Sequence, residues 1–172
     1  MKIHKLLCVL AIGWAATAAP GAAGGIDAKA AFAQLKQLEG VWESKGKEGV
    51  SRSEFELTGN GTVLLERFSN SALPGNGRMA TAYHLDGTDL VLTHYCMANN
   101  QPVLRAERFD AAAKEIQFEF VRAGNLATPN TGHMRRAMYR LVDKDHFVTE
   151  WEFFENGKKK FTETETFTRV KR

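Results

Sequence analysis

Hydrophobic and polar residues alternate along most of this chain in short segments, which is the pattern of β-strands. The clearest case is residues 115–122, where Ile116, Phe118 and Phe120 alternate with polar residues. Successive side chains of a strand point to opposite faces, so this spacing gives the segment one apolar face. Ten such segments are predicted as strands: residues 41–48, 50–57, 62–69, 78–85, 88–95, 101–108, 115–122, 134–142, 146–154 and 158–170.

Turn-forming residues separate most of these strands. Gly59-Asn60-Gly61, Asp86-Gly87, Asn99-Asn100 and Asn156-Gly157 supply the positive φ angles that tight turns need. No segment of helical period is long enough to lie between the strands. The sequence therefore predicts an all-β fold, a single ten-stranded up-and-down antiparallel β-barrel. Small closed barrels of this kind commonly hold a small ligand.

The hairpin around Asp86-Gly87 makes a specific prediction about two histidines. With these two residues as the loop, His84 lies opposite Asp89. If that register continues, His94 lies opposite Met79. The two histidines are then about 17 Å apart, which makes them a poor pair of metal ligands.

One short helix is predicted before the strands, over Asp27–Leu38. Its first residue is a suitable N-cap, and Phe32, Leu35 and Leu38 fall at helical spacing. In small barrels such a helix commonly closes one end. Trp42 follows at the first strand, and we expect it to seal that end as a buried core aromatic.

Residues 1–23 have the charged, apolar and small-residue order of a signal peptide. Cleavage after Ala18, Ala19 or Ala23 is possible, and Pro20 makes the site after Ala19 the least attractive. The apolar run is too short to span a bilayer. The sequence thus predicts an exported, periplasmic or secreted protein whose barrel domain is residues 24–172.

Charge and cysteine content narrow the classes of partner. Without residues 1–23 the chain has 21 basic and 20 acidic residues, so nothing favours nucleic acid, an anionic membrane surface or insertion into a membrane. Cys96 is then the remaining cysteine, and an intrachain disulfide is impossible. There is no HxH, no HExxH and no cysteine pair, so no metal site is predicted.

The densest polar cluster lies between Thr93 and Gln101. Strand alternation places His94 and Cys96 on one face and Tyr95 on the other, and we expect His94 and Gln101 to be inward polar contacts. The structural alternative is a hydrogen-bonded His94 near a strand end with Cys96 as a small buried filler. A catalytic Cys/His pair is the enzymatic alternative, although residues i and i+2 lie about 6–7 Å apart along a strand.

Two arginines and two loops complete the candidate site. Arg136 and Arg140 share a predicted face with Met134 and Met138 and are the first candidates to face inward and receive a carboxylate. The alternative is that they are solvated on the outer face. The long connections, residues 70–77 and 123–132, are candidates to border the mouth of a cavity.

Three segments together resemble a known family: LEGVWESKG, YHLDGTDLVLTHYCMANNQP and FTETETFTRV. They resemble bacterial secreted lipocalin-like proteins classed as a domain of unknown function, and the wider calycin group with fatty-acid-binding proteins and nitrobindin. The resemblance implies a ten-stranded barrel with Trp42 near its base. Haem binding, as in nitrobindin, would need an axial histidine in the C-terminal strands. Residues 158–172 contain none, so no cofactor is expected.

The sequence therefore favours a binding module for a small hydrophobic or amphipathic molecule that is partly apolar, with or without a carboxylate. The expected ligand-binding residues are His94, Gln101, Arg136, Arg140, Trp42 and Cys96. The alternative is an enzyme or haem-type redox protein that uses the cluster His94, Tyr95 and Cys96. No motif establishes a catalytic reaction, and nothing indicates the oligomeric state.

Overall fold

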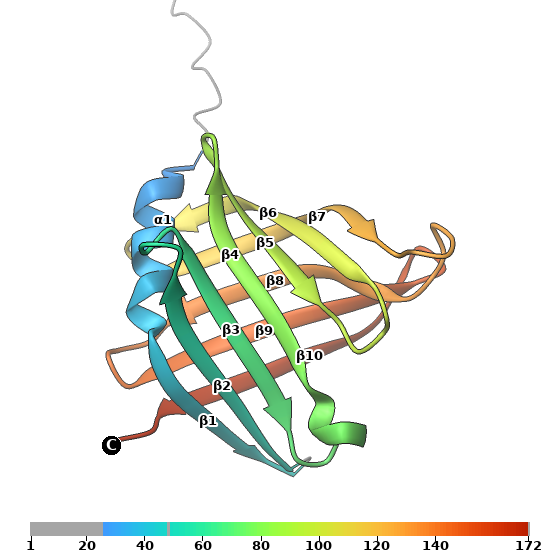
Figure 1. The fold of residues 1–172 in the computed structure, drawn as a ribbon, viewed down its shortest axis with the longest axis horizontal. Coiled ribbons are helices and arrows are strands. Elements are labelled where there is room, and N and C mark those ends of the chain that lie inside the picture. Colours follow the sequence, from blue (N-terminus) through green and yellow to red (C-terminus); the bar gives the residue numbers. More distant parts are fainter. Residues whose placement is uncertain (1–25, 48, 172) are drawn as a thin grey trace, which may run out of the picture.

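The computed structural model describes residues 26–47 and 49–171 and shows a closed β-barrel. The predicted signal peptide, residues 1–23, lies outside the described residues. The ten antiparallel strands are β1 (Gly40–Gly46), β2 (Gly49–Thr58), β3 (Val63–Asn70), β4 (Met79–Asp86), β5 (Asp89–Tyr95), β6 (Gln101–Asp110), β7 (Glu115–Gly124), β8 (His133–Leu141), β9 (His146–Glu155) and β10 (Lys158–Arg169). Each strand pairs with its neighbours in sequence, and β1 pairs with β10 (Figure 1). The predicted fold class is confirmed.

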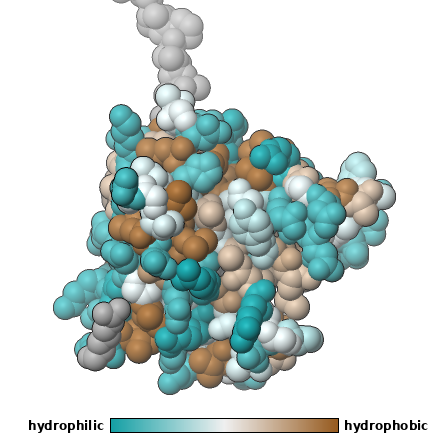
Figure 2. All heavy atoms as spheres, viewed as in Figure 1, coloured by the Kyte–Doolittle hydropathy of each residue, from teal (hydrophilic) through white to brown (hydrophobic). Residues whose placement is uncertain are grey.

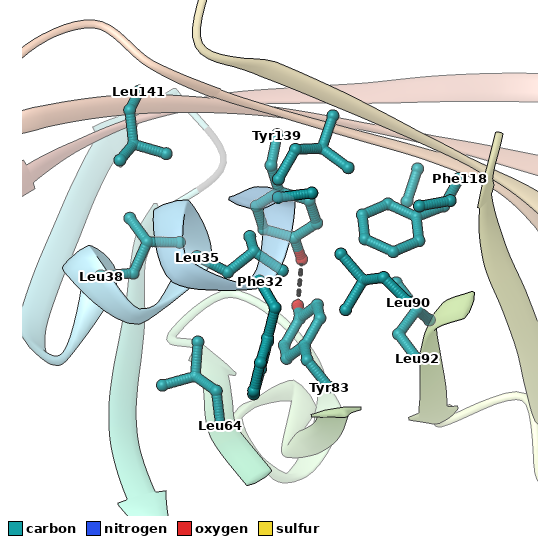
Figure 3. Packing of buried hydrophobic residues seen from close by; sticks show 14 of the residues in the cluster. Phe32, Leu35, Leu38, Leu64, Tyr83, Leu90, Leu92, Phe118, Tyr139 and Leu141 are labelled. Carbon is teal, nitrogen blue, oxygen red and sulfur yellow. Dashed lines mark hydrogen bonds between the residues drawn. The ribbon is translucent and has the colours of Figure 1, made fainter. Parts of the chain in front are cut away.

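The predicted N-terminal helix is present and covers one end of the barrel (Figure 1). It consists of α1 (Ala28–Leu35) followed by a 3₁₀ turn, η1 (Lys36–Leu38). The side chain of Asp27 caps it, accepting a hydrogen bond from the Ala30 amide at 2.9 Å. Its apolar face is buried in the core, where Figure 3 shows Phe32, Leu35 and Leu38 beside side chains of the strands.

Trp42 is 1% exposed and lies in this helix-covered end, which we call the base, as predicted. Its indole Nε1 donates to the carbonyl oxygen of Leu38 at 2.7 Å, and its ring meets the ring of Phe147 edge-on. The guanidinium of Arg169 lies 3.9 Å from the Trp42 ring centroid and donates to the carbonyl oxygens of Glu39 and Gln37. The last strand is thereby tied to the helix end and to the first strand.

The β4–β5 hairpin differs from the predicted register by two residues. Asp86 pairs with Asp89, so the loop is Gly87-Thr88 and not Asp86-Gly87. Gly87 has a φ of 59°, and glycine with positive φ is favoured at the first position of a two-residue loop. A shift of two keeps every side chain on its predicted face. It makes Thr81, and not Met79, the partner of His94.

The long connections lie at the end of the barrel opposite the base, which we call the open end. Because β1 starts beside the helix, each odd-numbered strand runs away from it, and the connections that follow these strands lie at the far end. These include the β3–β4 connection, which contains η2 (Pro74–Gly77), and the β7–β8 connection over residues 125–132. Both loops that the sequence singled out are therefore at the same end (Figure 1).

The outer face of the barrel is largely polar. Cross-strand ion pairs such as Arg67–Glu56, at 2.9 Å, lie on it, and Figure 2 shows hydrophilic side chains over much of one face with hydrophobic patches between them. Within the described chain, no helix has the length and apolar character needed to cross a bilayer.

Candidate functional site

A cavity of about 40 Å³ lies inside the barrel. It is lined by side chains from β3, β4, β5, β8, β9 and β10: Glu66, Phe68, Met79, Thr81, His94, Met134, Thr149, Trp151, Glu163, Glu165 and Phe167. Several of these residues, such as Met79, His94 and Met134, are close to the strand ends that form the open end. One water molecule needs about 10–15 Å³, so the cavity accommodates a small chemical group and not a bulky ligand.

His94 contributes a buried nitrogen to this lining that has no hydrogen-bond partner among the described residues. The side chain is 5% exposed, its Nδ1 lies 3.0 Å from the Thr81 hydroxyl, and its ring packs 4.8 Å from the ring of Trp151. Its Nε2 is buried without a hydrogen-bond partner among the described residues. Burial lowers the pKa of His94 to about 4, so the imidazole is neutral near pH 7.

Below His94 a buried carboxyl group is held by hydroxyl groups from three strands. Glu66 accepts hydrogen bonds from Ser53 and Tyr83, each at 2.7 Å, and from Tyr139 at 3.4 Å. The hydroxyl groups of Tyr83 and Tyr139 are also hydrogen-bonded to each other at 2.5 Å, and Figure 3 marks this bond with a dashed line. Burial raises the pKa of Glu66 and, together with the nearby Glu66 charge, raises the pKa of both tyrosines well above the usual value.

Beside this cavity, the pairing between the first and last strands of the barrel is short. The ladder between β1 and β10 comprises Trp42↔Arg169 and Glu43↔Thr168, both near the base. Towards the open end, a groove of about 220 Å³ lies where β1 and β2 face β10, and Glu163 and Glu165 line both the groove and the cavity. Ser51 crosses the groove by donating to Glu165 at 2.5 Å. The groove and the cavity therefore adjoin at Glu163 and Glu165 of β10.

Of the six residues expected to bind a ligand, the structure places His94 in the cavity lining. Trp42 is in the base, and Gln101 and Cys96 are half-buried outside the cavity lining. Tyr95 is 52% exposed, as alternation predicted. Burial, followed by the nearby Glu163 charge, raises the pKa of the Cys96 thiol. The structure does not bring His94, Tyr95 and Cys96 together.

Arg136 and Arg140 do not face inward as expected. Their side chains are 55% and 46% exposed, and they form ion pairs with Glu119 and Glu115 on the outer face. A β-bulge between Met134 and Arg136 is the reason, because the extra residue reverses the alternation along β8. Met134 consequently lines the cavity, while the arginines point outward.

Sequence reasoning missed two lining residues, of which one had a detectable signal. Glu66 alternates with Leu64 and Phe68 on the apolar face of its strand, and a charged residue on an apolar face marks an interior polar group. Trp151 belongs to a strand whose two faces are both mixed in polarity, so alternation alone did not reveal its inner face.

Comparison with known proteins found no matching family model and no matching curated protein. Across residues 26–47 and 49–171, no three His, Cys, Asp or Glu side chains are grouped so that they could hold a metal ion.

Proposed function

We propose that this protein is a binding module that receives part of a small, partly apolar molecule in the cavity beside His94. The observation that carries the proposal is the buried Nε2 of His94, which lacks a partner among the described residues. Buried polar atoms in folded proteins are almost always hydrogen-bonded, and a bound ligand is one way to satisfy this one.

The rest of the cavity lining supports the same function. Apart from its polar groups it consists of aromatic and methionine side chains, which favour apolar parts of a ligand: Phe68, Met79, Met134, Trp151 and Phe167. A cavity that combines apolar side chains with a few placed polar groups is the usual form of a small-molecule site. The groove between β1 and β10 has the room that the remainder of a ligand needs.

The alternative function, an enzyme or haem-type redox protein built on His94, Tyr95 and Cys96, has weaker support. It requires the three side chains to meet, whereas Tyr95 is exposed and His94 is buried. A nucleophilic cysteine is favoured by a lowered pKa, and the pKa of Cys96 is raised.

We also propose that the protein is exported and related to the calycin group. The helix-covered base around Trp42 and the closed order of ten strands support the relationship. The composition of residues 1–23 supports export. Recovery of the protein from the cell envelope with a mass that lacks the first 18 to 23 residues would support the cleavage expected here.

Native mass spectrometry of protein purified from its own cells tests the binding function. We expect a retained small molecule, and we expect His94→Ala to weaken its binding by about tenfold or more because a buried hydrogen bond is lost. His146→Ala is the matched control, since His146 is exposed and bonded to Asp143. Unchanged affinity and unchanged stability in His94→Ala would remove His94 from the site.

A further inference from the structure

The hydrogen bonds behind His94 determine what its free nitrogen can do. The Thr81 hydroxyl is bonded to His94 Nδ1, and Thr81 also lies directly opposite Glu66 in the β3–β4 ladder, where its hydroxyl lowers the pKa of that carboxyl. A hydroxyl has one proton. When that proton is donated to the Glu66 carboxylate, the Thr81 oxygen must accept the bond from His94. Nδ1 then carries the imidazole proton, and Nε2 presents a lone pair.

The cavity therefore offers a hydrogen-bond acceptor, and the charged residues of its lining also favour a ligand that donates. Glu163 and Glu165 line it together with Glu66, whereas lysine and arginine are absent from its described lining. The Glu163 carboxylate is close enough to Cys96 for its negative charge to raise the pKa of the thiol. A lone pair surrounded by carboxyl groups repels an anion and attracts a positively charged donor.

We propose that the site binds the ammonium group of a small organic amine. In this arrangement the ammonium group donates one hydrogen bond to His94 Nε2, with Glu163 and Glu165 as counter-charges. The short apolar part of the amine packs against Trp151 and Met79, which line the same cavity. This inference rests on the proposed binding function and replaces the expected carboxylate ligand, since the arginines expected to receive a carboxylate lie on the outer face.

The protonation state of His94 is consistent with an amine ligand. Because burial keeps the imidazole neutral near pH 7, the ring does not repel an incoming cation. An ammonium group has three donors, so it can also contact a carboxylate while it is bonded to Nε2. Packing beside the ring of Trp151 adds a cation–π contribution for a cation over its face.

Three probes of the same length distinguish the possible ligand classes: n-butylamine, n-butanol and butyrate. Each is titrated into ¹⁵N-labelled full-length protein at pH 7, with the resonances of Thr81, His94 and the Trp151 indole as reporters. We expect n-butylamine to bind about tenfold or more tightly than n-butanol, because a charged hydrogen bond is stronger than a neutral one, and butyrate to bind least.

Charge-removing variants that keep side-chain shape locate the source of the preference. Glu163→Gln and Glu165→Gln should each reduce the preference for the amine over the alcohol several-fold, by removing one counter-charge. Glu150→Gln is the matched control, because it removes one exposed carboxylate from the neighbouring strand β9 and is expected to leave the preference unchanged. Amide spectra of each variant establish that it is folded.

A long-range ¹H–¹⁵N spectrum of the His94 imidazole, recorded without ligand, tests the proton assignment independently of affinity. We expect Nδ1 to carry the proton, and a proton on Nε2 overturns the proposal. Preferential binding of butyrate or n-butanol, or an amine preference that survives both glutamine variants, overturns the amine class but leaves a binding cavity. If none of the three probes shifts the reporters, the proposed binding function fails as well.

Discussion

Glu66 shows how one buried side chain can organise the interior of a barrel. Its carboxyl group satisfies the hydroxyl groups of Ser53, Tyr83 and Tyr139 at once. We expect Glu66→Leu to lower the free energy of unfolding by about 2–4 kcal/mol, because the buried hydroxyl groups lose their acceptor. Urea unfolding measures the change. Glu56→Leu, at an exposed position of β2, should change stability by less than about 0.5 kcal/mol. Equal effects of the two substitutions would contradict the role of Glu66.

His94 makes stability depend on pH. The pKa of this histidine is about 4 in the folded protein against an ordinary value of 6.5, so between these values the unfolded chain binds a proton that the folded chain does not. Stability therefore falls as pH falls from 6.5 to 4, by about 3 kcal/mol from this residue. The raised pKa of Glu66 acts in the opposite direction over its own range.

Comparison with a His94→Gln variant isolates the contribution of His94. Urea unfolding at pH 7, 5 and 4 should show that the wild type loses about 3 kcal/mol more than this variant, because glutamine does not titrate. His146→Gln should follow the wild type, since His146 is exposed. Parallel curves for the wild type and His94→Gln would show that His94 titrates equally in the folded and unfolded chain.

At the residue scale, local pattern found the interior positions that follow strict alternation and missed those that depend on geometry. His94 and Trp42 were identified as inward residues, and both are buried. Arg136 and Arg140 were misplaced because a single extra residue in β8 reverses the two faces, and a bulge leaves no clear trace in the residue types around it.

At the scale of elements, the tie between the helix, β1 and β10 is the feature that we expect to matter most for stability. Trp42→Ala should lower the free energy of unfolding by about 3–5 kcal/mol, because it removes a fully buried aromatic side chain that packs on Phe147 and under Arg169. Chemical denaturation measures this effect. Phe161→Ala is the control, since Phe161 is 48% exposed, and its cost should stay below about 1 kcal/mol. A small effect at Trp42 would contradict its sealing role.

The existence and type of the ten strands and of the N-terminal helix could be predicted, because alternation, turn residues and the helix cap are local signals, whereas the 3₁₀ turn η2 lies in a segment expected to be a loop. The ten predicted strands match the observed ones within a few residues at each end. Register was less predictable. The β4–β5 loop lies one residue later than the turn signal indicated, and this shift determines that Thr81, and so the link to Glu66, is the neighbour of His94.

At the scale of the whole molecule, the barrel has two different ends. The base is covered by α1 and filled by aromatic rings, whereas the open end has the long connections, the cavity and the side groove. A closed barrel could be predicted from the number and spacing of the strands. The size and chemistry of its cavity could not, because they depend on which side chains from six distant strands meet in space.

The short ladder of two residue pairs between β1 and β10 also has a consequence for how the chain folds. It joins Trp42 to Arg169, so the barrel closes through a contact that spans most of the described chain. Hairpins form from neighbours in sequence, but this closure must overcome the entropy of a very long loop, which makes folding slow. Until closure, the first and last strands are open edges that can pair with another chain. We therefore expect self-association to be greater in the partly folded chain, in which both edges are exposed over their full length, than in the finished barrel.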